Sequence, residues 1–363
     1  MPSHLKQATL FALIVVSFIV ALPGAASGQQ PAAPKPATPP SAASQSTQAA
    51  SVTTPKGVEL VPSGTEMKVA RGAESYTNLS LAGSELHPQP PMSTAHVKNP
   101  DFERELVRVQ WRPNDPIDMY IVKPPQVKNP PVVLFLGDFS SELRPYTINF
   151  ACAFHVKNGA AAVGFVAAHA GRRAEHWPPN QWFVSELPES LAITVHDVQL
   201  ILNYLESRGD LDMTRVGMFG EGSGAAIAIL TAATDHRLKA IDLINPWGDW
   251  PDWLAKSHLL GQPDRDRCLK AEFLESVRGM DPVDYLPKLA GRPVRIQFVD
   301  DQLADIKDAV AKLDKAAPAS AHVIHRHGFQ EMYAANANGK AYEWIASMLK
   351  SDGGTKQAAV TAH

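Results

Sequence analysis

The sequence predicts an α/β domain in which helices cover both faces of a mostly parallel sheet of about eight strands. Continuous apolar runs such as residues 131–136 (PVVLFL) are typical of strands that are buried on both faces. Between such runs lie segments with apolar residues at helical spacing, such as residues 191–206. This alternation indicates parallel strands joined by crossover helices.

The expected elements follow one another between about residues 102 and 350. Two strands, joined by a turn around residues 114–116, come first and predict an antiparallel pair. Strands are expected at residues 106–111, 119–122, 131–136, 161–166, 216–219, 240–244, 294–299 and 322–325. Helices are expected at residues 147–157, 191–206, 225–233, 306–313 and 340–349.

The first 28 residues have the order of a secretory signal peptide. Lys6 supplies a positive charge, residues 10–22 form an uncharged apolar run, and small residues follow at 25–28. The apolar run is short for a membrane span, so cleavage is expected rather than stable membrane insertion. The protein is therefore expected to be exported, either to the periplasm or as a secreted protein.

The rest of the chain divides into four parts by composition. Residues 29–56 are rich in Ala, Pro and Ser and predict a disordered spacer. Residues 57–100 carry only a weak pattern and form a poorly defined extension, whereas residues 101–350 form the predicted domain. Residues 351–363 are expected to be a disordered tail.

The charge of the chain limits its expected partners, and its cysteine content limits the expected disulfides. The net charge is -3, from 34 basic and 37 acidic residues, so neither nucleic acid nor an anionic membrane surface is an expected partner. The two cysteines, Cys152 and Cys268, do not form a disulfide framework and are expected to be buried free thiols.

A glycine-rich turn joins a strand to a helix at residues 215–226 (RVGMFGEGSGAA). In a turn this sharp, the residues two before and two after the apex must be small. With Gly222 at the apex, both of these residues are glycines. With Ser223 at the apex, one of them would be Glu221, whose side chain is too large. The register therefore places Gly222 at the apex.

The turn resembles the nucleophile elbow of the α/β-hydrolase family, G-x-S-x-G. The resemblance covers about residues 102–350 and includes residues 280–294 (MDPVDYLPKLAGRPV) and a His-Gly-Phe motif at residues 327–329. Secreted esterases and prolyl-oligopeptidase-type peptidases are the nearest look-alikes. The resemblance implies the α/β-hydrolase fold and acyl transfer by a Ser-His-Asp triad, but Gly222 stands at the nucleophile position.

Ser223, the next residue, has two interpretations. It is either a relocated nucleophile or a serine at the helix start that satisfies backbone donors. A phosphate-binding loop is a third alternative for the turn. The dinucleotide pattern G-x-G-x-x-G would need a glycine where Ala225 stands, and the turn comes late in the sheet. The sequence therefore indicates no cofactor.

The resemblance also implies an acid and a histidine near the ends of the last strands. Asp301 is the preferred acid, with Asp300 and Asp249 as alternatives. His327 matches the histidine of the family's His-Gly-Phe motif. Two further histidines, His322 and His325, lie nearby, but no Cys or carboxylate stands at ligand spacing, so no metal site is expected.

The oxyanion loop of the family follows the strand expected at residues 131–136. Here the chain has Gly137, Asp138 and Phe139. An acidic side chain at this position would oppose the negative charge that develops in acyl transfer.

Two segments after strand ends could shape a pocket. Residues 171–183 contain Arg172 and Trp177, and residues 245–253 contain Trp247 and Trp250. The arginine could bind a carboxylate and the tryptophans an apolar or sugar face. The alternative is that these residues pack on one another as part of a cap.

Two functions remain open from the sequence. In the first, the protein is a serine hydrolase of ester or amide bonds in a small-molecule or peptide substrate and uses the displaced Ser223. In the second, it is a non-catalytic binding or scaffold protein on a hydrolase fold.

Overall fold

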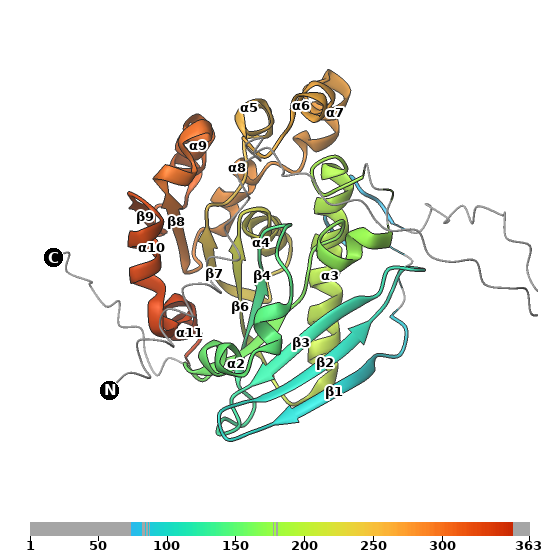
Figure 1. Cartoon of the computed structure of the whole chain (residues 1–363), viewed down its shortest axis with the longest axis vertical. Coiled ribbons are helices and arrows are strands. Elements are labelled where there is room, and N and C mark those ends of the chain that lie inside the picture. The colour runs from blue at the N-terminus through green and yellow to red at the C-terminus, as the bar shows by residue number, and fades with distance from the viewer. Residues whose placement is uncertain are drawn as a thin grey trace, which may run out of the picture. The chain divides into compact units, whose positions relative to one another are not determined.

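A nine-stranded sheet forms the centre of the domain and confirms the predicted fold class (Figure 1). In this computed structural model, the described residues are 74–81, 84, 86, 88–176, 178 and 181–350. The proposed signal peptide, spacer and tail lie outside them. The strands are β1 (Met92–Lys98), β2 (Glu103–Val109), β3 (Ile117–Lys123), β4 (Pro131–Leu136), β5 (Ala161–Gly164), β6 (Asp212–Glu221), β7 (Leu238–Ile244), β8 (Val294–Val299) and β9 (His322–Arg326).

The strand order is β1-β2-β3-β5-β4-β6-β7-β8-β9. β1, β2 and β3 pair antiparallel, and β3 is also antiparallel to β5. From β5 through β4 and β6 to β9 every pairing is parallel. The expected antiparallel pair therefore precedes a parallel sheet. The parallel part brings the carboxyl ends of β4, β6 and β7 to one edge.

Helices cover both faces of the sheet, as predicted. The α-helices are α2 (Asn149–Val156), α3 (Leu187–Arg208), α4 (Ser223–Thr234), α5 (Trp250–Lys256), α6 (Gln262–Cys268), α7 (Ala271–Arg278), α8 (Pro282–Tyr285), α9 (Lys307–Ala316), α10 (Phe329–Asn336) and α11 (Glu343–Met348). One apolar cluster packs α3 and α4 against the sheet, and a second packs α2 and α11 on the other face. No helix within the described ranges is long and apolar enough to cross a membrane.

Several elements were not predicted. β1 is exposed over almost its whole length, so its sequence MSTAHVK has no apolar alternation. The helices α5 to α8 are four to eight residues long, too short for a clear helical period. They form an insertion between β7 and β8, and α5, α6 and α7 gather at one end of the domain (Figure 1).

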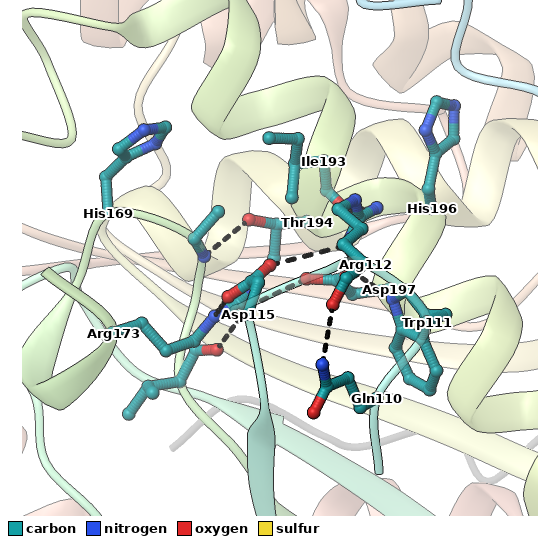
Figure 2. A network of polar contacts seen from close by, with 12 residues as sticks. Gln110, Trp111, Arg112, Asp115, His169, Arg173, Ile193, Thr194, His196 and Asp197 are labelled. Carbon is teal, nitrogen blue, oxygen red and sulfur yellow. Dashed lines mark hydrogen bonds and ion pairs between the residues drawn. The ribbon is translucent and has the colours of Figure 1, made fainter. Parts of the chain in front are cut away.

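A buried ionic network connects distant segments of the domain (Figure 2). The Asp197 carboxylate on α3 is fully buried and accepts hydrogen bonds from Arg112, from Nη1 of Arg173 (2.8 Å) and from Nε1 of Trp111 (2.7 Å). Burial alone would raise the pKa of Asp197, but the charges of Arg112 and Arg173 hold it below its usual value. Arg112 also binds Glu74, so the segment before β1 is attached to the same network.

Candidate functional site

The glycine-rich turn lies between β6 and α4, with Gly222 at its apex. Gly222 has φ 57° and ψ -119°, a backbone conformation that side chains rarely adopt. Its N–H donates to the carbonyl oxygen of Ile244 (3.0 Å), which ties the apex to the end of β7. The chain therefore reverses direction within one residue at the carboxyl edge of the sheet.

The two glycines beside the apex are required by close backbone contacts. A Cβ on Gly220 would lie 2.5 Å from the carbonyl oxygen of Gly224. A Cβ on Gly224 would lie 2.1 Å from the carbonyl oxygen of Leu136. Both distances are too short for any side chain, so the steric rule for a sharp strand-to-helix turn applies at these positions.

The carboxylate of Asp138 occupies the space above the apex. A Cβ on Gly222 would lie 2.7 Å from Oδ1 of Asp138. The same Oδ1 accepts hydrogen bonds from the backbone N–H of Ser223 (3.0 Å) and from its hydroxyl (2.8 Å). In the hydrolase family, this backbone N–H helps to hold the oxyanion. Here the donor already binds a carboxyl group of the protein itself.

Two acidic side chains with raised pKa values lie next to each other at the turn. Burial raises the pKa of Asp138 more than its hydrogen bonds from Ser223 and Phe139 lower it. Burial, and after it the negative charge of Asp138, raise the pKa of Glu221 to about 8. At neutral pH, Glu221 is therefore mostly protonated.

Ser223, which the sequence leaves open as either a relocated nucleophile or a helix-start serine, is fully buried. It is the first residue of α4, and its hydroxyl donates to Asp138. A substrate carbonyl has no access to a side chain that has no exposed surface.

His327 and Asp301 lie near each other after the last strands but are both exposed. Oδ2 of Asp301 is 3.4 Å from the backbone nitrogen of Phe329, and the backbone N–H of His327 donates to Glu331 (2.9 Å). Among the described residues, no hydrogen bond joins the imidazole of His327 to a carboxylate. Their triad roles remain a prediction.

The alternative acids have other partners. Oδ1 of Asp300 lies 3.0 Å from Nδ1 of His325. Oδ2 of Asp249 lies 2.6 Å from Nζ of Lys312, and the Asp249 backbone N–H donates to Asp281. Within the described part of the chain, no group of three or more His, Cys, Asp or Glu side chains could hold a metal ion.

The tryptophans that were candidates for substrate binding are part of the core. Trp247 and Trp250 are both buried, and each packs against Trp253. Nε1 of Trp250 donates to the carbonyl oxygen of Met280 (2.9 Å). This burial favours the alternative in which the residues pack on one another. Arg172 is exposed on a surface cleft, and Trp177 lies outside the described residues.

A cavity of about 110 Å³ lies beside the turn and was not predicted. It reaches from Gly137 and Glu221 to α2 and α10, and its walls are mainly apolar and aromatic. One signal for it is present in the sequence, because Glu221 carries a carboxyl group at the end of a buried strand. The other lining residues come from segments far apart in the chain and carry no common motif.

Comparison with known proteins identifies the fold. No family model and no curated protein matches the chain. Among solved structures, the acetyl xylan esterase from Paenibacillus sp. R4 is similar with a TM-score of 0.54 and 16% identity, over 68% of this chain and 84% of that one. Acetyl xylan esterase 1 from Thermoanaerobacterium sp. JW/SL YS485 is similar with a TM-score of 0.56 and 14% identity, over 75% of this chain and 92% of that one. At these identities the likeness concerns the fold. Together with the strand order and the sharp turn after β6, it shows that the chain has the fold of the α/β-hydrolase superfamily.

Proposed function

We propose that this protein is an exported, non-catalytic binding protein built on the α/β-hydrolase fold. The observation that carries the proposal is the position of Asp138. Its carboxylate fills the space of a nucleophile side chain on Gly222 and binds the backbone donor that an oxyanion would need.

Electrostatics explains why this arrangement opposes acyl transfer. A tetrahedral intermediate carries a negative oxygen that needs free donors at the elbow. With Asp138 in place, this oxygen would compete with a carboxylate for the N–H of Ser223. An ionised carboxylate would also repel the developing charge. The intermediate would therefore be destabilised even if a nucleophile were present.

The possible catalytic partners support the same conclusion. Gly222 has no side chain to attack a substrate, and Ser223 is buried. His327 is exposed and has no described hydrogen bond to an acid that would orient it. A working triad needs a nucleophile, a base and an orienting acid within hydrogen-bond reach of one another.

Ser223 supports a second candidate function, hydrolysis of an ester or amide of a small molecule or peptide. Its hydroxyl donates to Oδ1 of Asp138 at 2.8 Å, which is the distance a carboxylate base needs to accept the proton. This candidate requires the turn to open, because Ser223 has no exposed surface in the structure.

Reaction with a fluorophosphonate probe separates the two functions. The purified protein is treated with the probe, and labelled residues are identified by mass spectrometry. Hydrolysis of short acyl esters is measured in parallel for the wild type, for Ser223→Ala and for Ser257→Ala, which alters another buried serine.

The proposal expects no label on Ser223 and the same background rate for all three proteins. A label on Ser223, with turnover that is lost in Ser223→Ala but kept in Ser257→Ala, would establish the second function instead.

Export has its own test. The signal-like order of residues 1–28 supports it, so the N-terminus of the protein recovered outside the cytoplasm should lie near residues 27–29. Recovery of a chain that still begins with Met1 would contradict cleavage.

A further inference from the structure

We infer that the cavity beside the turn binds a small protonated amine whose apolar body lies against aromatic rings. The inference rests on the proposed function, because it takes the site as one that binds a ligand without acylation. Its observations are the aromatic walls of the cavity, an unpaired carboxyl group, an unpaired hydroxyl group and the sign of the lining charges.

Aromatic rings form much of the cavity wall. His155 stacks on Tyr342 with ring centroids 5.0 Å apart and lies 4.8 Å from the Tyr146 ring. Phe135 meets Tyr342 edge-on at 4.7 Å, and Phe219 meets it at 5.5 Å. All five residues line the cavity. Aromatic faces attract both apolar groups and cations.

The carboxyl group of Glu221 lies at the cavity without a partner. It follows the apolar part of β6 and is only partly exposed. Among the described residues, none donates a hydrogen bond to this carboxyl group and none forms an ion pair with it. A carboxyl group in an apolar surrounding is costly to ionise, and a bound cation would offset that cost.

A second polar group of the cavity also has no partner. Ser141 lines the cavity and is more than nine-tenths buried, and its hydroxyl has no hydrogen bond among the described residues. Buried polar atoms are nearly always paired in folded proteins, so this one points to a missing donor or acceptor. An ammonium group has three N–H donors and can donate to the carboxyl group of Glu221.

The lining charges select for a cation. Two acidic residues, Glu142 and Glu221, line the cavity, and Glu221 becomes negative as the pH rises through about 8. The described lining contains no lysine or arginine. A carboxylate ligand therefore finds no positive partner, whereas an ammonium group meets complementary charge once Glu221 is ionised.

The volume limits the ligand to a small molecule. An engineered apolar cavity of about 150 Å³ holds benzene. This cavity is smaller, at about 110 Å³, but it is open on one side, so a ligand with one small apolar group can extend into the opening. Benzylamine is a suitable probe, with benzyl alcohol and benzoate as neutral and anionic analogues of similar shape.

Binding should release a proton. Glu221 has a pKa of about 8 in the free protein, so the amine must displace a proton to gain a carboxylate partner. The affinity for benzylamine should therefore rise with pH while the amine stays protonated. The affinity for benzyl alcohol should stay constant.

The test is titration of the full chain with the three probes, followed by ligand-observed NMR at pH 6 and pH 8. We expect benzylamine to bind about tenfold more tightly than benzyl alcohol at pH 8, because a charge-assisted hydrogen bond is stronger than a neutral one. Benzoate should not bind. The preference for the amine should fall by about tenfold or more at pH 6.

Glu221→Gln keeps the shape of the side chain and removes the charge. It should abolish the preference for the amine and leave binding of benzyl alcohol unchanged, which also shows that the cavity is intact. Glu272→Gln, an exposed substitution on α7, is the matched control and should change neither.

Three results would overturn the inference: equal affinity for benzylamine and benzyl alcohol at both pH values, a preference for the amine that survives in Glu221→Gln, or no binding of any probe. Each leaves the fluorophosphonate result unaffected, so a failure here is distinct from a failure of the proposed function.

Discussion

Gly222 and Asp138 are complementary residues at the turn, since one lacks the side chain whose space the other fills. Gly222→Ser would place Cβ 2.7 Å from Oδ1 of Asp138. Asp138 would have to turn away and lose both hydrogen bonds from Ser223. Because these hydrogen bonds are lost and a serine must adopt the positive φ of residue 222, we expect the free energy of unfolding to fall by about 2–4 kcal/mol, measured by urea denaturation.

Gly209→Ser is the matched control for this loss. Gly209 also has a positive φ (73°), but a Cβ there would meet nothing within 4 Å. Gly209→Ser should therefore lower the free energy of unfolding by about 1–2 kcal/mol, which is the strain of the left-handed backbone alone. Equal losses for both variants would mean that Asp138 does not restrict the apex.

The same geometry predicts how activity could be introduced. Gly222→Ser alone should show little esterase activity, because the displaced carboxyl group of Asp138 stays beside the turn and, when ionised, repels the negative oxygen of the intermediate. Combined with Asp138→Gly, this group is removed, and a low rate of ester hydrolysis above that of the single variant is expected. Activity in the single variant equal to that in the double variant would show that Asp138 is no obstacle.

Glu221 predicts an unusual pH dependence of stability. Its pKa is raised from 4.5 to about 8 in the folded protein, so the folded state holds the proton more tightly than the unfolded state. The resulting stability is fully present below pH 4.5 and is lost as the pH rises through 8.

The comparison of the wild type with Glu221→Gln at pH 5.5 and pH 8.5 tests this pH dependence. Raising the pH should lower the free energy of unfolding of the wild type by about 1–3 kcal/mol more than that of the variant. The measurement is urea denaturation at both pH values. An identical change in both proteins would contradict a raised pKa at Glu221.

At the scale of elements, the long helix α3 holds the segment that precedes β1. Nε2 of Gln199 donates to the carbonyl oxygen of Leu79 (2.8 Å), and its Oε1 accepts from the N–H of Leu81 (3.2 Å). Nδ1 of His196 lies 2.5 Å from Glu74. These contacts come from successive turns of one helix face.

Gln199→Ala should therefore weaken the attachment of residues 74–81 without unfolding the domain. We expect a loss of about 1–2 kcal/mol in the free energy of unfolding, because a buried carbonyl group and a partly buried N–H lose their partner. Faster amide exchange or proteolysis confined to this segment is the readout. Gln126→Ala removes one hydrogen bond from an exposed side chain to the carbonyl oxygen of Pro100. It should change neither the free energy of unfolding nor the exchange and proteolysis of residues 74–81.

The elements also show which parts of the fold a sequence can predict. The expected strands 131–136 and 294–299 have the same bounds as β4 and β8, because every residue of both strands is buried and most of them are apolar. β1 could not be predicted from the sequence because most of its residues are exposed and show no apolar alternation. The expected helix at residues 340–349 is instead a 3-10 segment, Ala337–Tyr342, followed by α11.

The candidate site was less predictable than the fold for a physical reason. Steric rules act locally, so the apex at Gly222 follows from its neighbours in sequence. The cavity depends on side chains such as Ser141, His155 and Tyr342, which only tertiary packing brings together. The position of Asp138 over the apex likewise requires the packing of β4 beside β6.

At the scale of the whole domain, the buried network of Figure 2 joins segments that no single sheet pairing connects. Asp115 in the turn between β2 and β3 binds Arg173, and Asp197 on α3 binds both Arg173 and Arg112. An ion pair in the core that loses one partner leaves the other charge buried and uncompensated. The network should therefore be sensitive to single substitutions.

Asp197→Ala should cost about 3–5 kcal/mol in the free energy of unfolding at pH 7, because it leaves two buried guanidinium groups without their shared carboxylate. Asp118→Ala is the matched control. Asp118 also binds an arginine, Arg108, with two hydrogen bonds (2.7 and 2.9 Å), but this pair lies partly exposed on the sheet. It should cost about 0–1 kcal/mol.

The pH dependence separates the loss of charge pairing at Asp197 from a simple loss of packing. The pKa of Asp197 is lowered from 3.8 in the folded protein, so its stabilisation is present above pH 3.8 and is lost as the pH falls through the lowered pKa. Below that pKa, both arginines face a neutral group in the wild type as well. The difference in unfolding free energy between the wild type and Asp197→Ala should therefore shrink in acid, whereas a loss of packing alone would persist unchanged across the same urea titrations.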